Sequence, residues 1–136
     1  MRLLRIIFCA ALLLAASAAI PQTKQGDVTA DIPFAFVVAR QTLPAGHYVI
    51  SPTSTDSLGI HDGNNRGTFV PTQSTERSIH DNTCKLVFRR YGDTYFLSEV
   101  WASGNTIGKA LFRSHAEREL EASGKEKEVA VVRLGK

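Results

Sequence analysis

The sequence predicts an all-β protein: a single-domain antiparallel sandwich or partly open barrel of seven or eight short strands, with one short helix in the C-terminal region. Three observations lead to this prediction. Apolar residues recur at every second position in several segments, clusters of turn-forming residues separate these segments, and only one stretch has a helical pattern. No linker or repeat divides the chain, so we expect residues 28–136 to form one domain.

The strongest strand signal lies in residues 85–101, KLVFRRYGDTYFLSEVW. Two apolar runs flank Gly92-Asp93, a dipeptide that tolerates the positive φ of a tight hairpin turn. A two-residue loop places Phe88 opposite Leu97. A three-residue loop places Phe88 opposite Phe96 and Lys85 opposite Glu99. Because opposed apolar or oppositely charged side chains contribute roughly 0.2–1 kcal/mol per pair, we favour the three-residue loop. Both faces carry apolar groups, so we expect other strands to cover this hairpin.

A second hairpin is expected in the N-terminal half. Period-two alternation in residues 32–38 puts four apolar side chains on one face of a strand. Pro33 cannot donate a ladder hydrogen bond, so the strand lies at an edge or bends there. Residues 43–46, LPAG, predict a type II turn in which Gly46 supplies the positive φ, and 47–50 is the return strand.

One helix is expected at residues 114–122. Ser114 and Glu117 fit a capping box, and the glutamates that follow favour helix. Few apolar side chains there can face a core, so we expect a short surface helix, with the mixed charges of 117–128 exposed to solvent. The remaining short strands are expected at 58–61, 68–70, 106–109 and 129–134.

The first residues have the pattern of an export signal. Arg2 and Arg5 precede a short apolar run, and Ala16-Ser17-Ala18 fits a small-residue cleavage site. We therefore expect a signal peptide at 1–19, a flexible leader at 20–27, and a protein exported to the periplasm or the extracellular space. Because a membrane span needs about 20 apolar residues, we expect no stable membrane span after signal cleavage.

Removal of the signal changes the charge and the cysteine content. Without Arg2 and Arg5, 14 of the 16 basic residues remain against 13 acidic residues, a net charge of +1 in place of +3. This balance argues against nucleic acid as a partner. Cys9 is lost with the signal, which leaves Cys84 alone in the mature chain. We expect Cys84 to be a small core side chain, either free or bridged between chains.

Five segments share a pattern with known sequences: IPFAFV at 32–37, LPAGHY at 43–48, LVFRRYGD at 86–93, YFLSEVW at 95–101 and SHAEREL at 114–120. They are spread over most of the mature chain, which on their pattern resembles an uncharacterised family of small exported bacterial proteins. The resemblance implies export and a single domain. It carries no activity, cofactor or catalytic residue over to this chain.

Two His-Asp pairs are the candidates for metal chemistry, His61-Asp62 and His80-Asp81. A catalytic zinc site needs three protein ligands, and a carboxylate often orients a ligating histidine. Adjacent residues on a strand point to opposite faces, so such a site requires both pairs to lie in loops. It would make the chain a small metal-dependent hydrolase. The nucleophile-elbow motif G-x-S-x-G is absent, and we assign no catalytic residue and expect no cofactor.

The aromatic residues of the central hairpin are the candidates for ligand binding. Tyr91, Tyr95 and Trp101, with Arg89 and Arg90 beside them, would form a strip if they shared one exposed face. Such a strip could stack on sugar rings or hold an acidic glycan or a lipid headgroup. The chain would then be an envelope glycan-binding module. The competing interpretation is that Trp101 and Tyr95 belong to the core, because a domain with a single core needs its large aromatics there.

These observations favour an exported β domain with a non-enzymatic binding or structural role at the cell envelope. Its partner would be another protein or an envelope component, and its oligomeric state is left open. The metal-dependent hydrolase and the glycan-binding module are the alternatives.

Overall fold

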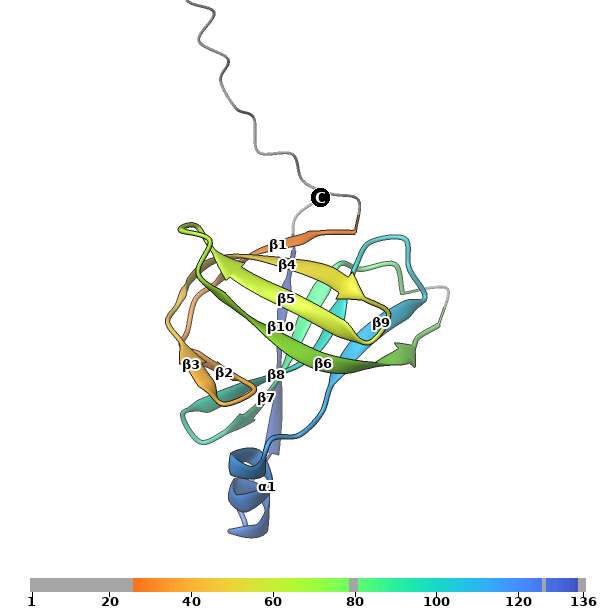
Figure 1. Cartoon of the computed structure of the whole chain (residues 1–136). Coiled ribbons are helices and arrows are strands. Elements are labelled where there is room, and N and C mark those ends of the chain that lie inside the picture. The colour runs from red at the N-terminus through yellow and green to blue at the C-terminus, as the bar shows by residue number, and fades with distance from the viewer. Residues whose placement is uncertain (1–25, 79–80, 126, 135–136) are drawn as a thin grey trace, which may run out of the picture.

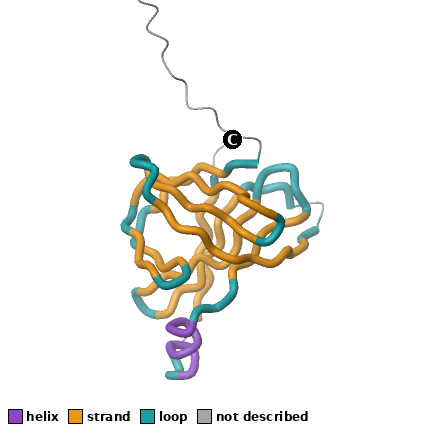
Figure 2. Tube along the Cα trace, viewed as in Figure 1, coloured by secondary structure: helices purple, strands orange, loops and turns teal. Residues whose placement is uncertain are grey.

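The computed structural model describes residues 26–78, 81–125 and 127–134. This part of the chain is mostly strand, with one short helix (Figures 1 and 2). The predicted signal peptide, 1–19, and most of the predicted leader, 20–27, lie outside the described residues. The elements are β1 (Val28–Ile32), β2 (Phe36–Val38), β3 (Gln41–Leu43), β4 (Gly46–Ser54), β5 (Ser57–Asp62), β6 (Gly67–Glu76), β7 (Lys85–Tyr91), β8 (Thr94–Trp101), β9 (Ile107–Leu111), α1 (His115–Ala122) and β10 (Lys127–Arg133).

Two layers share strand β6. Its first half, from Gly67 to Pro71, pairs with β5 in an antiparallel sheet that continues to β4 and β1. Its second half, from Thr72 to Glu76, pairs with β9, and the ladder continues through β8 and β7 to β10. The β2–β3 hairpin joins β8 through a short parallel pairing of β2 with β8. The sheet does not close, which confirms the predicted all-β sandwich or partly open barrel.

The N-terminal half has more strands than predicted, because the run 32–38 is divided. Pro33 is exposed at the bend between β1 and β2, as expected for a residue without an N–H. The return strand β4 pairs with β1 and not with β2, with Ile32 opposite Gly46. The predicted type II turn is wrong, because neither Ala45 nor Gly46 has a positive φ.

The main core lies between the two layers. In β1, Val28, Ala30 and Ile32 are buried while the residues between them are exposed, so the strand alternates as a half-buried strand should. Two of the largest core rings, Phe36 and Phe88, meet edge to face with centroids 5.7 Å apart. The other buried members include Val38, Tyr48, Ile50, Leu58, Ile60, Leu86, Leu97 and Leu111. Half-buried Cys84 packs against this cluster as a free thiol.

The central hairpin, β7–β8, has the two-residue loop and not the favoured three-residue loop. Tyr91 is opposite Thr94, and the register then runs to Phe88 opposite Leu97. Gly92 has a φ of +61°, whereas Asp93, the other residue of this two-residue loop, does not have a positive φ. A glycine at the first loop position is the preference of the type II′ turn, whose twist matches that of the strands.

A β-bulge in this hairpin explains why the pairing argument failed. Further along, Val87 lies opposite Glu99, so Ser98 is an extra residue on β8. Because of this insertion, Leu97 and Val100 both join the main core, although strict alternation would put them on opposite faces. A uniform register could not satisfy both ends of the hairpin.

The predicted helix is present and is capped as expected. It begins after Ser114, whose hydroxyl accepts a hydrogen bond from the Glu117 N–H at 3.2 Å, and it is followed by Gly124 with a φ of +79°. Figure 1 shows α1 at the end of the molecule opposite β1. The expected exposure of the whole charged segment is wrong at one position, because Glu117 is buried.

Candidate functional site: a groove beside the helix

A buried ion pair joins α1 to the central hairpin. Glu117 is 1% exposed, and its carboxylate accepts hydrogen bonds from Arg89 Nε and, at 3.1 Å, from Arg89 Nη2. The Tyr91 hydroxyl donates to the same carboxylate at 3.2 Å, and Arg89 also donates to Ser98 Oγ at 2.7 Å. Burial, and next the charge of Glu117, raise the pKa of Tyr91 above its ordinary value of 10.0, so Tyr91 remains a donor at neutral pH. The helix is therefore fixed in position by charge-assisted hydrogen bonds.

A groove lies between the helix segment and the β2–β3 hairpin. Its volume is about 940 Å³, near the upper end of the roughly 300–1,000 Å³ typical of small-molecule sites. One wall is formed by residues 112–120 and the other by β2, β3 and the turn between them. Phe96 of β8 and Val70 of β6, which are both buried, also line it.

Apolar side chains line this groove on both sides. Val37 is on the face of β2 opposite to the buried Phe36 and Val38, so it faces away from the main core. On the helix side, half-buried Leu120 and Phe112, which is 56% exposed, line the groove. A phenylalanine with this exposure leaves a large apolar area in contact with water.

The groove also carries more positive than negative side chains. Arg40, Arg113 and Arg118 line it, against one carboxylate, Glu119. Arg113 is paired with Glu121 at 2.7 Å, and His115 lies 3.3 Å from Glu119. Among the described residues, Arg40 and Arg118 have no ion-pair partner.

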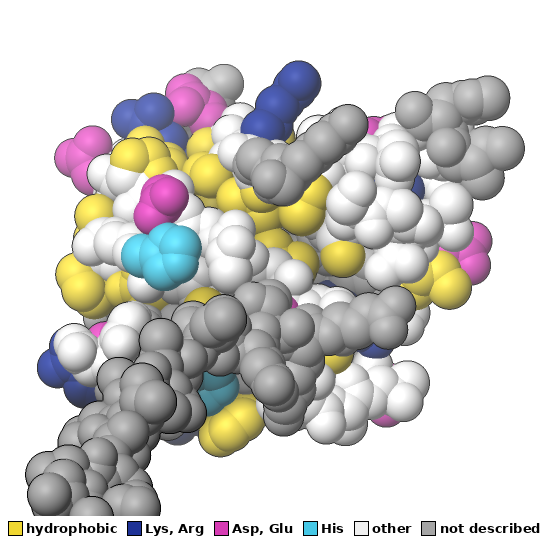
Figure 3. All heavy atoms as spheres, turned by 90° about the horizontal axis from the view of Figure 1, so that it is seen from above, with side chains coloured by type: hydrophobic (Ala, Val, Ile, Leu, Met, Phe, Trp, Pro, Cys, Tyr) yellow, Lys and Arg dark blue, Asp and Glu magenta, His cyan; other side chains and the backbone are white. Residues whose placement is uncertain are grey.

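The end of the molecule seen in Figure 3 offers a contrast to the groove. There, among the side chains drawn in colour, acidic and basic groups are interspersed and do not gather into a patch of one sign. By contrast, the groove is a local concentration of arginines.

The predicted aromatic strip does not form in the structure. Tyr91 is fully buried against Glu117 and Phe96, whereas Tyr95 packs on the main-core side, stacked on Phe34 with ring centroids 3.8 Å apart. Arg89 is held by the buried ion pair, and Arg90 lies over the Tyr95 ring at 5.4 Å. The candidate residues are thus divided between two faces of the hairpin.

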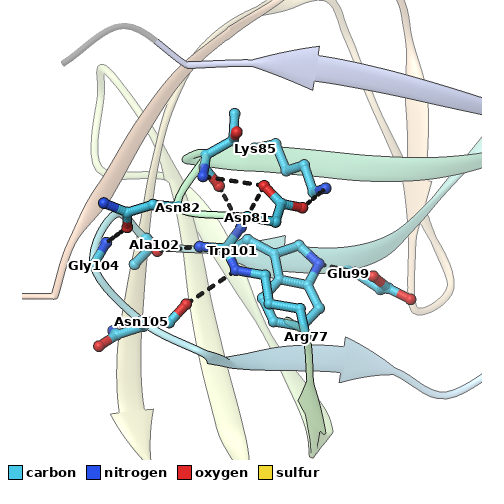
Figure 4. A network of polar contacts seen from close by, with 10 residues as sticks. Arg77, Asp81, Asn82, Lys85, Glu99, Trp101, Ala102, Gly104 and Asn105 are labelled. Atoms are coloured by element: carbon cyan, nitrogen blue, oxygen red, sulfur yellow. Dashed lines mark hydrogen bonds and ion pairs between the residues drawn. The ribbon is translucent and has the colours of Figure 1, made fainter. Parts of the chain in front are cut away.

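Trp101 is enclosed by a polar network (Figure 4). It is 4% exposed, its indole N–H donates to Glu99 at 2.8 Å, and the Arg77 guanidinium lies over its ring at 4.8 Å. Arg77 also donates to the carbonyls of Thr83, Ala102 and Asn105. Arg77 therefore connects the loop that contains Thr83 with the loop that contains Ala102 and Asn105, and it covers the indole. Trp101 has a packing role.

The first His-Asp pair is divided between two faces of β5. His61 lies beside the ring of Phe69 on the outer face, with ring centroids 5.8 Å apart. The Asp62 carboxylate accepts from the N–H groups of Asn64 and Arg66, both at 2.9 Å, and from the Arg66 side chain. These bonds, led by the Arg66 backbone N–H, lower the pKa of Asp62. Asp62 thus closes its own turn.

Asp81 has a similar local role in the loop before β7. It accepts from Lys85 Nζ at 2.7 Å and from the Thr83 N–H at 3.2 Å, and the Lys85 contact is the main reason that its pKa is lowered to about 2. Asp62 and Asp81 lie beyond opposite ends of β6, whose ten residues span roughly 30 Å at the usual strand rise. The structure therefore does not bring these two carboxylates together, and His80 lies outside the described residues.

Comparison with protein-family models, curated proteins and solved structures finds no match. Within 26–78, 81–125 and 127–134, no group of three or more His, Cys, Asp or Glu side chains is placed to hold a metal ion. No helix in the same ranges is both long and apolar enough to cross a membrane.

Sequence reasoning missed the groove because its parts come from distant segments. Arg40 lies in a two-residue turn, Phe112 precedes the helix, and Phe96 belongs to the hairpin. The only indication in the sequence was Phe112, a large apolar residue next to a segment that is expected to lie at the surface.

Proposed function

We propose that this chain is an exported, non-enzymatic domain of the cell envelope that binds a ligand in the groove between α1 and the β2–β3 hairpin. The observation that carries the proposal is the groove itself, with a volume of about 940 Å³ and apolar side chains on both walls. Concave, largely apolar sites of this size are the usual places where small molecules bind.

The structure of the walls supports a binding role. The Arg89–Glu117 pair holds the helix wall of the groove against the central hairpin. Two carboxylates that were candidates for catalysis have local structural roles, because Asp62 and Asp81 each accept hydrogen bonds within their own turn or loop. Export rests on the signal pattern in residues 1–19.

Binding of the neutral fluorescent dye N-phenyl-1-naphthylamine to the purified mature chain tests this proposal. Phe112→Ser should weaken dye binding, because it removes an apolar wall of the groove. Phe69→Ser is the matched control, since Phe69 is 66% exposed and lies on β6 outside the groove. Equal dye binding by the two variants would contradict the assigned site. Hydrolysis of a substrate that is lost on Asp81→Asn would contradict the non-enzymatic role.

A further inference from the structure

We propose that the occupant of the groove is a monomeric single-chain amphiphile with a carboxylate headgroup, a fatty acid. This inference rests on the proposed function and adds to it the chemical class of the ligand. Two features of the groove carry it: apolar side chains on both walls, and two arginines whose charges no described side chain neutralises.

The apolar walls account for the hydrocarbon chain. Val37 projects from β2 away from the main core, and Phe112 and Leu120 line the facing wall. Phe96, which is buried, also lines the groove. A flexible hydrocarbon chain laid between these walls would remove apolar surface from water on both sides, and this contribution would not depend on the headgroup.

The arginines account for the headgroup. Arg40 is at the tip of the β2–β3 hairpin and Arg118 is on α1, so a cation stands on each wall of the groove. The other two basic groups of the groove are already engaged, Arg113 with Glu121 and His115 with Glu119. Two unpaired guanidinium groups favour an anion, and their planar donor geometry matches a carboxylate.

The groove volume of about 940 Å³ is within the range of small-molecule sites. A membrane surface is the other source of acidic headgroups. The two can be distinguished by experiment, because binding of a monomeric fatty acid and binding to lipid vesicles are measured separately.

The experiment is displacement of N-phenyl-1-naphthylamine from the delipidated mature chain at pH 8. The displacing ligands are dodecanoate and dodecanol, each below its aggregation concentration. We expect the wild type to bind dodecanoate about tenfold or more tightly than dodecanol, because charge-assisted hydrogen bonds are made only by the acid. Arg40→Gln combined with Arg118→Gln should bring the two affinities together by weakening the acid alone. Arg133→Gln, on exposed β10 outside the groove, is the matched control and should keep the preference.

Each other outcome has a defined meaning. Equal displacement by acid and alcohol, with both reduced by Phe112→Ser, would overturn the headgroup assignment and leave the proposed groove function standing. Binding to phosphatidylglycerol vesicles without displacement by monomeric dodecanoate would overturn the inference in favour of a membrane surface. Dye binding that does not respond to Phe112→Ser would remove the proposed function itself.

Discussion

Arg89 and Glu117 form a bidentate ion pair between the central hairpin and the helix, on the sheet face turned away from the main core. The pair is almost completely enclosed, with side-chain exposures of 14% and 2%. It gives the molecule a second buried region that is polar at its centre. The helix wall of the groove depends on it.

We expect Glu117→Gln to lower the free energy of unfolding by about 3–5 kcal/mol, because it leaves the Arg89 charge buried without a counter-charge. Glu119→Gln is the control on the same helix. Glu119 is 68% exposed and lies beside His115, so its loss should change stability by less than about 0.5 kcal/mol. Urea unfolding measures both variants, and equal small losses would show that the pair does not hold the helix.

Trp101→Ala distinguishes packing from ligand binding. Trp101 is 4% exposed and enclosed by Arg77, so we expect a loss of about 3–5 kcal/mol in unfolding free energy. Phe69→Ala, which removes an aromatic side chain that is 66% exposed, should cost far less. A Trp101→Ala protein with an unchanged melting temperature would return the indole to the list of binding candidates.

The environment of the indole gives a second prediction, at Gly108. A Cβ added to Gly108 would lie 2.5 Å from the Trp101 ring, whereas one added to Gly63 would meet nothing within 4 Å. Gly108→Ala should therefore destabilise the fold by about 1–3 kcal/mol through overpacking. Gly63→Ala should be neutral or slightly stabilising. Thermal unfolding followed by tryptophan fluorescence measures the difference, and similar midpoints would contradict the close approach.

Much of the fold follows from local patterns in the sequence. Alternation in β1, the turn at Gly92 and the cap at Ser114 are each set by a few neighbouring residues, and all three are present in the structure. The hairpin register was mispredicted because it depends on the bulge at Ser98. Pairing energies favoured the wrong loop because they were applied to one uniform register, without the extra residue at Ser98.

The candidate site was much less predictable, because it depends on which faces meet. Glu117 looked like one more solvated helix charge, and only the position of Arg89 on the hairpin explains its burial. Tyr91 and Tyr95 looked like neighbours in a binding strip, yet they lie on opposite faces of the hairpin. These relationships join residues far apart in sequence, or depend on the register of the hairpin, and no short motif encodes them.

The low pKa of Asp81 predicts how the loop before β7 responds to acid. The hydrogen bond from Lys85 is the largest cause of the shift from the ordinary 3.8 to about 2. Because the folded-state pKa is lower than the unfolded one, the contribution of this contact is complete above pH 4 and is lost as the pH falls toward 2.

Carboxyl-detected NMR titration checks this directly. The Asp81 carbon should titrate with a midpoint near 2 in the wild type and closer to 3.8 in Lys85→Met. Lys109→Met is the control, because Lys109 donates to the Thr55 carbonyl and not to Asp81. An Asp81 midpoint near 3.8 in the wild type would mean that the Lys85 contact does not persist in solution.

Export predicts a defined chemical change in the chain. When the full-length protein is expressed in a bacterium, mass spectrometry of the periplasmic or secreted fraction should find a chain that begins at Ala19 or Ile20, without Arg2, Arg5 or Cys9. Such a chain has a net charge of +1 and one cysteine. Ala18→Lys should block cleavage, since the site requires a small residue at this position. Gln22→Lys adds the same charge beyond the cleavage site and should be processed normally. A full-length chain found in the cytoplasm for the wild type and for both variants would remove the argument for an envelope location.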